Sequence, residues 1–362
     1  MHARFIGFIV RDPAPKVYVT LLLAGCGALV FDLLSIPVAW LSGSMIAVAV
    51  AAFAGVPVTV PNVLRTVIFF VLGINIGAAV TPETVRGIAT WPLSILILLI
   101  CVPIVSLACA LPLIYWRGWK RNDALMASVP GALSLILALA DSTEADVPRI
   151  AIVQAVRVAV LMAIIPPLLA VTAATEFEIG LPDLPLASLP QLAVLIAGGL
   201  IGSLAFRLIR FPAPTLIGAL VVSAVLHGTD LVSGTMPGAM LIAAFVILGA
   251  SVGARFAGLG WQRLRSTLAD AMMTLTIGFA ISVAFAILVT RWLGFPFSQT
   301  LMAFSPGAFE VMVVMAFVMG VDAAYVGAHH TIRFFALAML APVLFRRQPK
   351  SRRSAGSDTT SS

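Results

Sequence analysis

The segment LMASVPGA at residues 125–132 returns as LMAFSPGA at residues 301–308. The two segments are 176 positions apart, and the same offset joins Asp146 to Asp322 and Arg157 to Arg333. The chain therefore contains two copies of one unit. Because proline lacks a backbone donor and glycine tolerates unwinding, we expect each Pro-Gly pair to interrupt a helix. In an apolar chain, paired interruptions of this kind predict a membrane fold whose site lies where the two copies meet.

The composition is typical of a protein embedded in a lipid bilayer. Of the 362 residues, 61% are hydrophobic and 10% are charged, whereas soluble domains have roughly 45–50% apolar and roughly 25% charged residues. Several apolar stretches reach the ~20 residues that a helix needs to cross a bilayer. We therefore predict an all-α integral membrane protein.

The net charge of +7 comes from short basic clusters between the apolar stretches, at residues 117–121, 207–210, 255–265 and 346–353. Such clusters are expected on the cytoplasmic side of membrane proteins. A nucleic-acid reader would need one basic face with a docking element. We therefore predict no direct contact with nucleic acid, and we place both termini in the cytoplasm.

Further matches between the copies define the organisation of the chain. Residues 36–43 correspond to residues 211–218, and residues 72–77 correspond to residues 248–253. We predict a cytoplasmic N-terminus (1–16), a first membrane repeat (17–174), a linker (175–188), a second membrane repeat (189–345) and a basic, disordered cytoplasmic tail (346–362).

The charges also select a topology. Each repeat has six apolar segments, and if all of them crossed the membrane, the basic clusters of the second repeat would lie outside. If each Pro-Gly segment instead enters and leaves on one side, each repeat crosses five times, and the second repeat is inverted with its basic clusters inside. We predict an inverted repeat of about ten transmembrane helices plus two re-entrant or broken segments.

The interrupted segments are the first candidates for a binding site. Unwinding at Pro130, Gly131, Pro306 and Gly307 would free carbonyl groups and helix ends to contact a solute. The alternative is a proline kink that only shapes helix packing.

Charged residues follow each interruption at fixed distances. Arg157 and Arg333 lie about three turns into an apolar helix, because each follows its aspartate by eleven residues. An arginine inside a membrane is costly, so we expect these two to contact an anion or to pair with a buried carboxylate. Asp146 and Asp322 are predicted to cap the helices that they precede.

The two copies diverge at titratable positions. Glu310 replaces Ser134, and His329-His330 replaces Val153-Gln154. Glu310, His329 and His330 are therefore candidates for a proton relay, and Glu310 is also a candidate solute contact. Alternatively, Glu310 only pairs with Arg333, and the histidines are packed helix residues.

Two further polar residues lie between paired glycines. Asn75 in Gly73-xxx-Gly77 and Ser251 in Gly249-xxx-Gly253 could bind the solute or a neighbouring helix, while the glycines themselves favour close helix packing. Asp32 is expected to pair with an arginine. We find no nucleotide loop, no metal-ligand cluster and no nucleophile-base arrangement, and we predict no catalytic residues, no metal, no cofactor and no enzymatic activity.

The doubled Leu-Gly-xxx-Gly and Pro-Gly-Ala blocks, together with the Asp146–Arg157 and Asp322–Arg333 spacings, resemble the AbrB-duplication family of bacterial polytopic membrane proteins. The resemblance covers nearly the whole chain and implies the bacterial inner membrane. Members of that family are described as regulators of gene expression and are sometimes labelled ammonia monooxygenases. They are unrelated to the soluble DNA-binding fold of the same name.

These observations favour a secondary transporter or exporter of a small solute, for which an anion is one candidate, that works by alternating access, with one repeat rocking against the other. The alternative is a membrane regulator or sensor that acts indirectly on gene expression. A membrane oxygenase is disfavoured because the four histidines form no metal-binding cluster in the sequence. The expected partners are the bilayer, an unknown small solute and a second copy of the chain in a homodimer.

Overall fold

The computed structural model of the chain describes residues 13–80, 82–130, 145–172 and 185–344. Within these ranges the chain forms helices and turns, and its β-structure is one isolated bridge between Leu186 and Thr235. Six of the described helices are long and apolar enough to cross a membrane, and four shorter helices are also apolar. The prediction of an all-α integral membrane protein is confirmed.

The helices of the two halves follow the same order. The first half forms α2 (Pro13–Leu33), α3 (Ala39–Phe53), α4 (Asn62–Ala78), α5 (Pro82–Gly87), η1 (Ile88–Thr90), α6 (Trp91–Tyr115), α7 (Arg121–Ser128) and α9 (Val147–Thr172). The second half forms α10 (Leu189–Leu208), α11 (Pro214–Gly228), α12 (Gly238–Gly253), η2 (Ala254–Phe256), α13 (Trp261–Leu293), α14 (Phe297–Phe304), α15 (Phe309–Val318) and α16 (Ala323–Leu344). The pairs α4 and α12, α7 and α14, and α9 and α16 each begin 176 positions apart.

The turns that lead into α3 and α11 share an uncommon backbone. Ser35 and Val38 have positive φ angles of 54° and 56°, and the matching residues Arg210 and Ala213 have φ angles of 55° and 45°. A left-handed conformation is unusual for a branched side chain such as Val38. Its presence at matching positions indicates that both halves use the same turn.

Small residues let neighbouring helices approach closely. A Cβ atom on Gly43 of α3 would collide with the carbonyl oxygen of Gly27 in α2, and a Cβ on Gly218 of α11 would collide with that of Gly202 in α10. Such contacts between backbones are how helices pack in a bilayer, where apolar burial alone cannot drive association.

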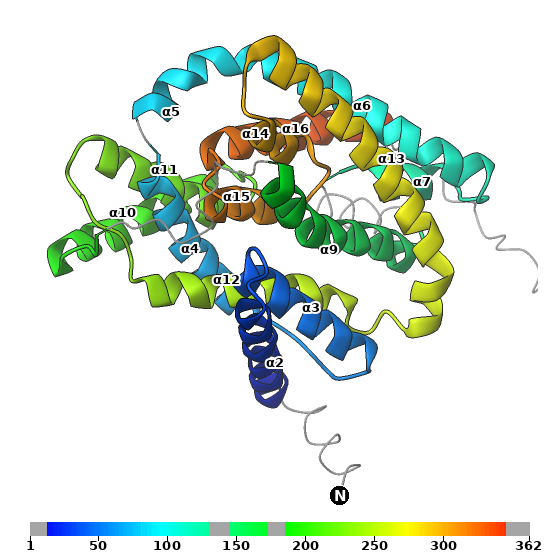
Figure 1. Ribbon diagram of the computed structural model, residues 1–362, viewed down its shortest axis with the longest axis horizontal. Coiled ribbons are helices and arrows are strands. Elements are labelled where there is room, and N and C mark those ends of the chain that lie inside the picture. The colour runs from blue at the N-terminus through cyan, green and yellow to red at the C-terminus, as the bar shows by residue number, and fades with distance from the viewer. Residues whose placement is uncertain (1–12, 81, 131–144, 173–184, 345–362) are drawn as a thin grey trace, which may run out of the picture.

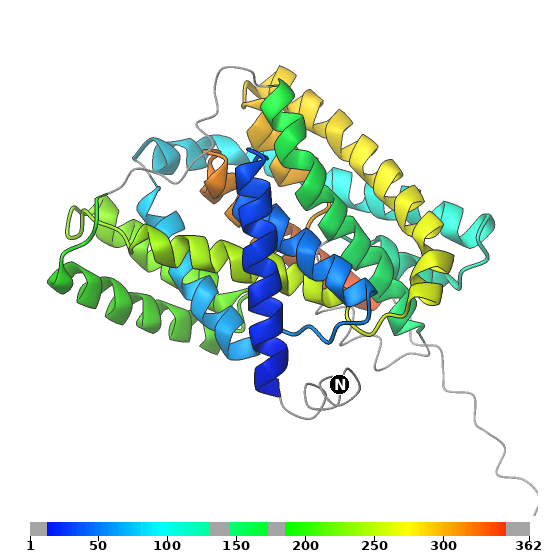
Figure 2. The same ribbon diagram turned by 60° about the horizontal axis from the view of Figure 1, so that its bottom comes forward.

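The helices assemble into two bundles, and each bundle draws on both halves of the chain (Figures 1 and 2). The peripheral bundle contains α2–α4 and α10–α12, in which α3 packs on α12 and α4 packs on α11. The break bundle contains α6, α7, α9 and α13–α16, in which α13 packs on both α6 and α9. Because helices of both halves pack together in each bundle, the bundles and not the repeats are the separately packed units.

In each half, the residue before the interrupted segment contacts the start of the helix that follows it. Phe295, just before α14, packs on Tyr325 at the start of α16, with 5.1 Å between ring centroids. In the first half, Trp119 before α7 lies under the guanidinium of Arg149 in the first turn of α9, at 3.9 Å. Each pair joins the chain before the interrupted segment to the chain after it.

These two junctions lie at opposite ends of α6. Trp91, the first residue of α6, packs on Tyr325 at 5.6 Å between centroids. Trp119 follows the last residue of α6 by four positions. Because 25 helical residues extend about 37 Å, the two junctions lie far apart, at opposite ends of α6.

Candidate functional site

The second interruption, here called the second break, comprises Ser305–Ala308 between α14 and α15. Its backbone is extended at Ser305 and Ala308, with ψ angles of 139° and 137°. A Cβ atom on Gly307 would collide with the side chain of Met312, which would have to move to admit it. The predicted helix interruption at Pro306-Gly307 is therefore present.

The first break begins at Val129 and Pro130, directly after α7. Gly131 and Ser134 lie outside the described residues. Val129 has an extended backbone, with a ψ angle of 124°.

Each break is held by the buried arginine of the same half. Arg333 donates from Nη1 to the Ser305 carbonyl at 2.8 Å and from Nη2 to the Gly307 carbonyl at 3.4 Å. Arg157 donates from Nη2 to the Val129 carbonyl at 3.1 Å. The arginines thereby satisfy carbonyl groups that the end of a helix leaves without partners.

Arg157 also reaches two carbonyls at the end of α7. Its Nη1 donates to the Ala127 and Ser128 carbonyls, both at 3.4 Å. Neither Arg157 nor Arg333 forms an ion pair with an acidic side chain among the described residues. The expectation that they pair with a buried carboxylate is therefore not met in that part of the chain, and their hydrogen bonds go to the main chain.

His330 supports the second break together with Arg333. Its Nε2 is 3.0 Å from the Met302 carbonyl, and its Nδ1 is 2.5 Å from Nη2 of Arg333. In the first half, Gln154 donates from Nε2 to the Met126 carbonyl at 2.9 Å. The histidine and the glutamine occupy matching positions and make matching bonds.

His329 has different surroundings from its counterpart Val153. Its Nδ1 is 2.8 Å from the Tyr325 carbonyl, and its Nε2 is 2.8 Å from the hydroxyl of Ser94 in α6. The rings of His329 and Tyr325 lie 3.9 Å apart. His329 thus connects α16 to α6 at the end of the bundle where the second break opens.

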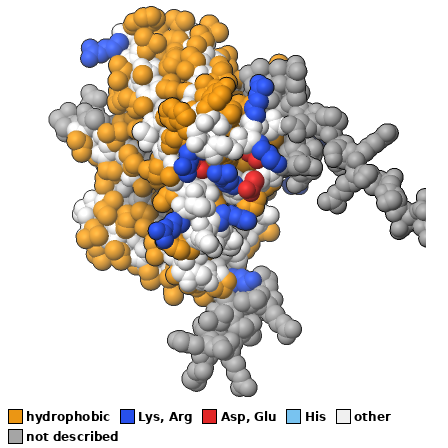
Figure 3. Space-filling model, turned by 90° about the vertical axis from the view of Figure 1, so that its right-hand side faces the viewer, with side chains coloured by type: hydrophobic (Ala, Val, Ile, Leu, Met, Phe, Trp, Pro, Cys, Tyr) orange, Lys and Arg blue, Asp and Glu red, His pale blue; other side chains and the backbone are white. Residues whose placement is uncertain are grey.

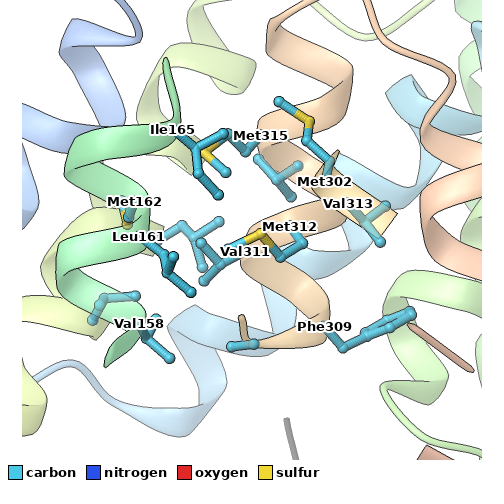
Figure 4. Close-up of a cluster of buried hydrophobic side chains, with 14 of the residues drawn as sticks. Val158, Leu161, Met162, Ile165, Met302, Phe309, Val311, Met312, Val313 and Met315 are labelled. Carbon is cyan, nitrogen blue, oxygen red and sulfur yellow. The ribbon is translucent and has the colours of Figure 1, made fainter. Parts of the chain in front are cut away.

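An apolar cluster surrounds the breaks. Figure 4 shows part of this cluster, in which Leu161 and Ile165 of α9 lie beside Val311, Met312 and Met315 of α15. Met302 of α14 lies beside them. All of these side chains are buried, so the guanidinium groups lie in surroundings of low polarity.

Comparison with known proteins places the chain in a family. The family model described as "Transition state regulatory protein AbrB" matches residues 40–348. The chain belongs to the AbrB family. It is 25% identical over 318 residues to "Putative regulator AbrB" of Escherichia coli (strain K12), covering 86% of this chain and 90% of that protein. It is 24% identical over 302 residues to "Uncharacterized protein YhjN" of Bacillus subtilis (strain 168), covering 76% of each. The resemblance to the AbrB-duplication family is confirmed.

The two aspartates of this AbrB-family chain lie at helix starts. Oδ1 of Asp322 accepts hydrogen bonds from the N–H groups of Ala324 and Tyr325, both at 3.0 Å. Oδ1 of Asp146 accepts from the N–H group of Arg149 at 3.2 Å. These are the bonds of a helix cap.

Glu310 lies in the first turn of α15 and is half-buried. It forms no ion pair with Arg333 within the described part of the chain, and it acts electrostatically on Arg255 of η2. Arg65 of α4 acts on the same arginine. Glu310 therefore lies within electrostatic range of Arg255. The sequence analysis did not predict this interaction.

Asn75 and Ser251 lie in the peripheral bundle, and each bonds within its own helix. Asn75 donates to the Val71 carbonyl and Ser251 to the Ile247 carbonyl, both at 2.8 Å. The glycines around them are packing positions as expected, since a Cβ on Gly73 would collide with the Leu216 carbonyl of α11. The described contacts do not bring Asn75 or Ser251 to the breaks.

Asp32 makes no ion pair with another described residue. Together with the turn before α3, Phe245 of α12 and Val318 of α15, it lines a cavity of about 440 Å³. This cavity lies where the peripheral bundle meets the C-terminal end of α15. The expected pairing of Asp32 with an arginine is not seen in the described ranges.

A buried ionic cluster was missed by the sequence analysis. Asp270 of α13 is fully buried and accepts hydrogen bonds from Nε of Arg117, from Nε1 of Trp119 at 2.9 Å and from Nη2 of Arg149 at 2.9 Å. On the face that Figure 3 shows, Lys, Arg, Asp and Glu side chains gather in one area that hydrophobic side chains border. The 176-residue offset pairs Asp270 with Ser94 and Arg149 with Tyr325, so the polar cluster around His329 is its counterpart.

Proposed function

We propose that this AbrB-family protein is a secondary transporter that moves a small solute across the bacterial inner membrane by alternating access. The observation that carries the proposal is the pair of helix breaks, each held open by a buried arginine inside a membrane bundle. Breaks in membrane helices are tolerated where they line a site or a water-filled path. Transporters built from repeats bind their substrates at such breaks.

The opposite openings of the two segments support an inverted repeat with ten crossings. The Trp119–Arg149 and Phe295–Tyr325 junctions lie beyond opposite ends of α6. If the basic residues 117–121 are cytoplasmic, the first break opens toward the cytoplasm and the second toward the outside. Both termini are then cytoplasmic.

The boundary between the bundles supports a moving part. The peripheral bundle meets the break bundle mainly where α3 and α12 contact α9 and where α4 contacts α15. An apolar groove of about 420 Å³ runs along this boundary, lined by residues of α3, α9, η2 and α13. A bundle bordered by open space can shift against its neighbour with little loss of packing.

A cross-link across that groove tests the mechanism. Ala49 of α3 and Ala159 of α9 both line the groove, and replacing each with cysteine would let a bifunctional reagent join the bundles. The exposed native Cys26 would first be changed to serine, whereas Cys101 and Cys109 are buried. Ligands would be identified by thermal shift, because a ligand that binds the native state raises the melting temperature.

Counterflow of each ligand found in this way would then be measured in proteoliposomes. We expect cross-linking to abolish counterflow and to leave ligand binding within a few-fold of its original strength. The single-cysteine variants treated with the same reagent serve as controls. Unchanged counterflow in fully cross-linked protein would contradict motion between the bundles.

The name of the E. coli relative, "Putative regulator AbrB", favours a second function, that of a regulator or sensor. In this proposal the protein senses a solute and affects gene expression indirectly, without binding DNA and without enzymatic activity. The same experiment separates the two functions. A ligand that binds but shows no counterflow, while deletion of the gene still changes expression, would favour the sensor.

A further inference from the structure

The first break contains two buried polar groups without a hydrogen-bond partner. These are the hydroxyl of Ser128 and Nε of Arg157. Ser128 is 1% exposed and Arg157 is 3% exposed, so bulk water does not reach either group. Buried polar groups in native proteins nearly always have partners, and an exception indicates a missing water, ion or ligand.

The two groups belong to one location. Nη1 of Arg157 donates to the carbonyl of Ser128 itself, which places the guanidinium beside that residue. The two Nη groups donate three hydrogen bonds to carbonyls, whereas Nε has no partner. Because a guanidinium only donates hydrogen bonds, whatever binds Nε must be an acceptor.

The second break does not offer the same groups. Phe304 stands at the position that matches Ser128. The hydroxyl of Ser305 donates to the Leu301 carbonyl at 2.6 Å, so it is satisfied within its own helix. The free donors therefore distinguish the first break from the second.

The local charge favours an acceptor with a negative charge over a neutral one. Arg157 and Arg333 lie close enough to act on each other electrostatically, and neither has an acidic partner among the described residues. The carboxyl-terminal ends of α7 and α14 carry about −0.5 charge each. They offset part of the two guanidinium charges, and a positive charge remains at Arg157. Because Arg157 is buried, solvent screens this charge poorly.

We propose that the first break binds a small, singly charged anion of the carboxylate type, which accepts hydrogen bonds from the Ser128 hydroxyl and from Nε of Arg157. Arg333 stabilises the anion through its charge while it holds the second break. This inference rests on the proposed transport function, for which it names the class of solute. It can also be tested by binding alone.

Acetate and acetamide are suitable probes because they have nearly the same shape and differ in charge. The full-length protein in detergent would be titrated with each compound at constant ionic strength, and the thermal unfolding midpoint would be recorded. We expect acetate to raise the midpoint in a saturable way and acetamide to leave it unchanged. Formate, the smaller carboxylate, should behave like acetate.

Ser128→Ala is the decisive variant because it removes an unpartnered hydroxyl and should still fold. We expect it to weaken acetate binding about tenfold, the effect of losing one hydrogen bond to a charged group. Ser44→Ala is the matched control. Ser44 is also buried, but its hydroxyl bonds to the Trp40 and Leu41 carbonyls in the peripheral bundle, so acetate binding should be unchanged.

Equal responses to acetate and acetamide, or no response to either, would overturn the anion site. Unaltered acetate affinity in Ser128→Ala would do the same. Binding of acetate that depends on Ser128 without any counterflow would refute transport and keep the site. Counterflow of a neutral solute that acetate does not inhibit would keep transport and refute the site.

Discussion

Gln154 and His330 make the same hydrogen bond in the two halves of the chain. Gln154 donates to the Met126 carbonyl at 2.9 Å, and His330 lies 3.0 Å from the Met302 carbonyl. Positions 154 and 330, like 126 and 302, differ by 176. A neutral imidazole protonated at Nε2 can donate to Met302 and accept from Arg333 at Nδ1. The bond that the two halves share requires a hydrogen-bond donor at this position. It does not require a side chain that changes its protonation state.

His330→Gln should therefore be well tolerated. The glutamine can repeat the bond that Gln154 makes, so we expect the free energy of unfolding to change by less than about 1 kcal/mol. His330→Leu leaves the Met302 carbonyl unpaired in a buried position and should cost about 1–3 kcal/mol. Thermal unfolding in detergent would measure both. Equal loss of stability in the two variants would show that the imidazole ring itself is needed.

Arg333→Gln should destabilise the protein strongly. The guanidinium bonds to two carbonyls of the second break, and each hydrogen bond to a charged group contributes about 1.5–3 kcal/mol. We expect a lower unfolding midpoint and a smaller yield in the membrane fraction. Arg291→Gln, which changes an exposed arginine in the last turn of α13, is the control. A stable Arg333→Gln protein that fails only in counterflow would assign this arginine to the solute.

The sequence predicted the breaks because proline and glycine act locally. The Pro306-Gly307 interruption and the depth of Arg333 both follow from residue type and spacing. What Arg333 binds could not be predicted, because its partners are carbonyl groups that every residue possesses. The depth of the arginine suggested that it contacts an acidic side chain or an anion. In the structure it donates to main-chain carbonyl oxygens instead.

The packing of helices from the two halves against each other could not be predicted from the sequence either. Repeats indicate which helices match but not which helices touch, so α3 packing on α12 had to come from the structure. The Asp270 cluster could have been predicted in part from the sequence, since the offset pairs Asp270 with Ser94 and Arg149 with Tyr325. Asp270 was overlooked because it lies nine residues into α13, where basic neighbours suggested a membrane boundary.

Asp270→Asn should weaken the junction between α13, α9 and the chain after α6. The change removes the counter-ion of Arg117 and Arg149, whose side chains are 44% and 33% exposed. Water screens these partly exposed cations, so we expect a loss of about 1–3 kcal/mol rather than the larger cost of an isolated buried charge. Thermal unfolding midpoints would measure it. Asp230→Asn alters an exposed acid and should have no effect.

The contact between α3 and α12 can be tested with a pair of glycine substitutions. A Cβ on Gly249 of α12 would collide with the Leu41 carbonyl and the Ser44 hydroxyl of α3, so Gly249→Ala should destabilise the protein by about 1–3 kcal/mol. Gly25 of α2 has nothing within 4 Å of its Cβ position. Gly25→Ala should be neutral or stabilising by up to about 1 kcal/mol, because alanine favours a helix.

The comparison also tests how the halves are arranged, because Gly249 belongs to the second half and Leu41 to the first. If Gly249 faced lipid, the two alanine variants would unfold at similar temperatures. A clear difference between their midpoints in detergent requires close packing at Gly249, where the structure places Leu41 and Ser44 of the first half.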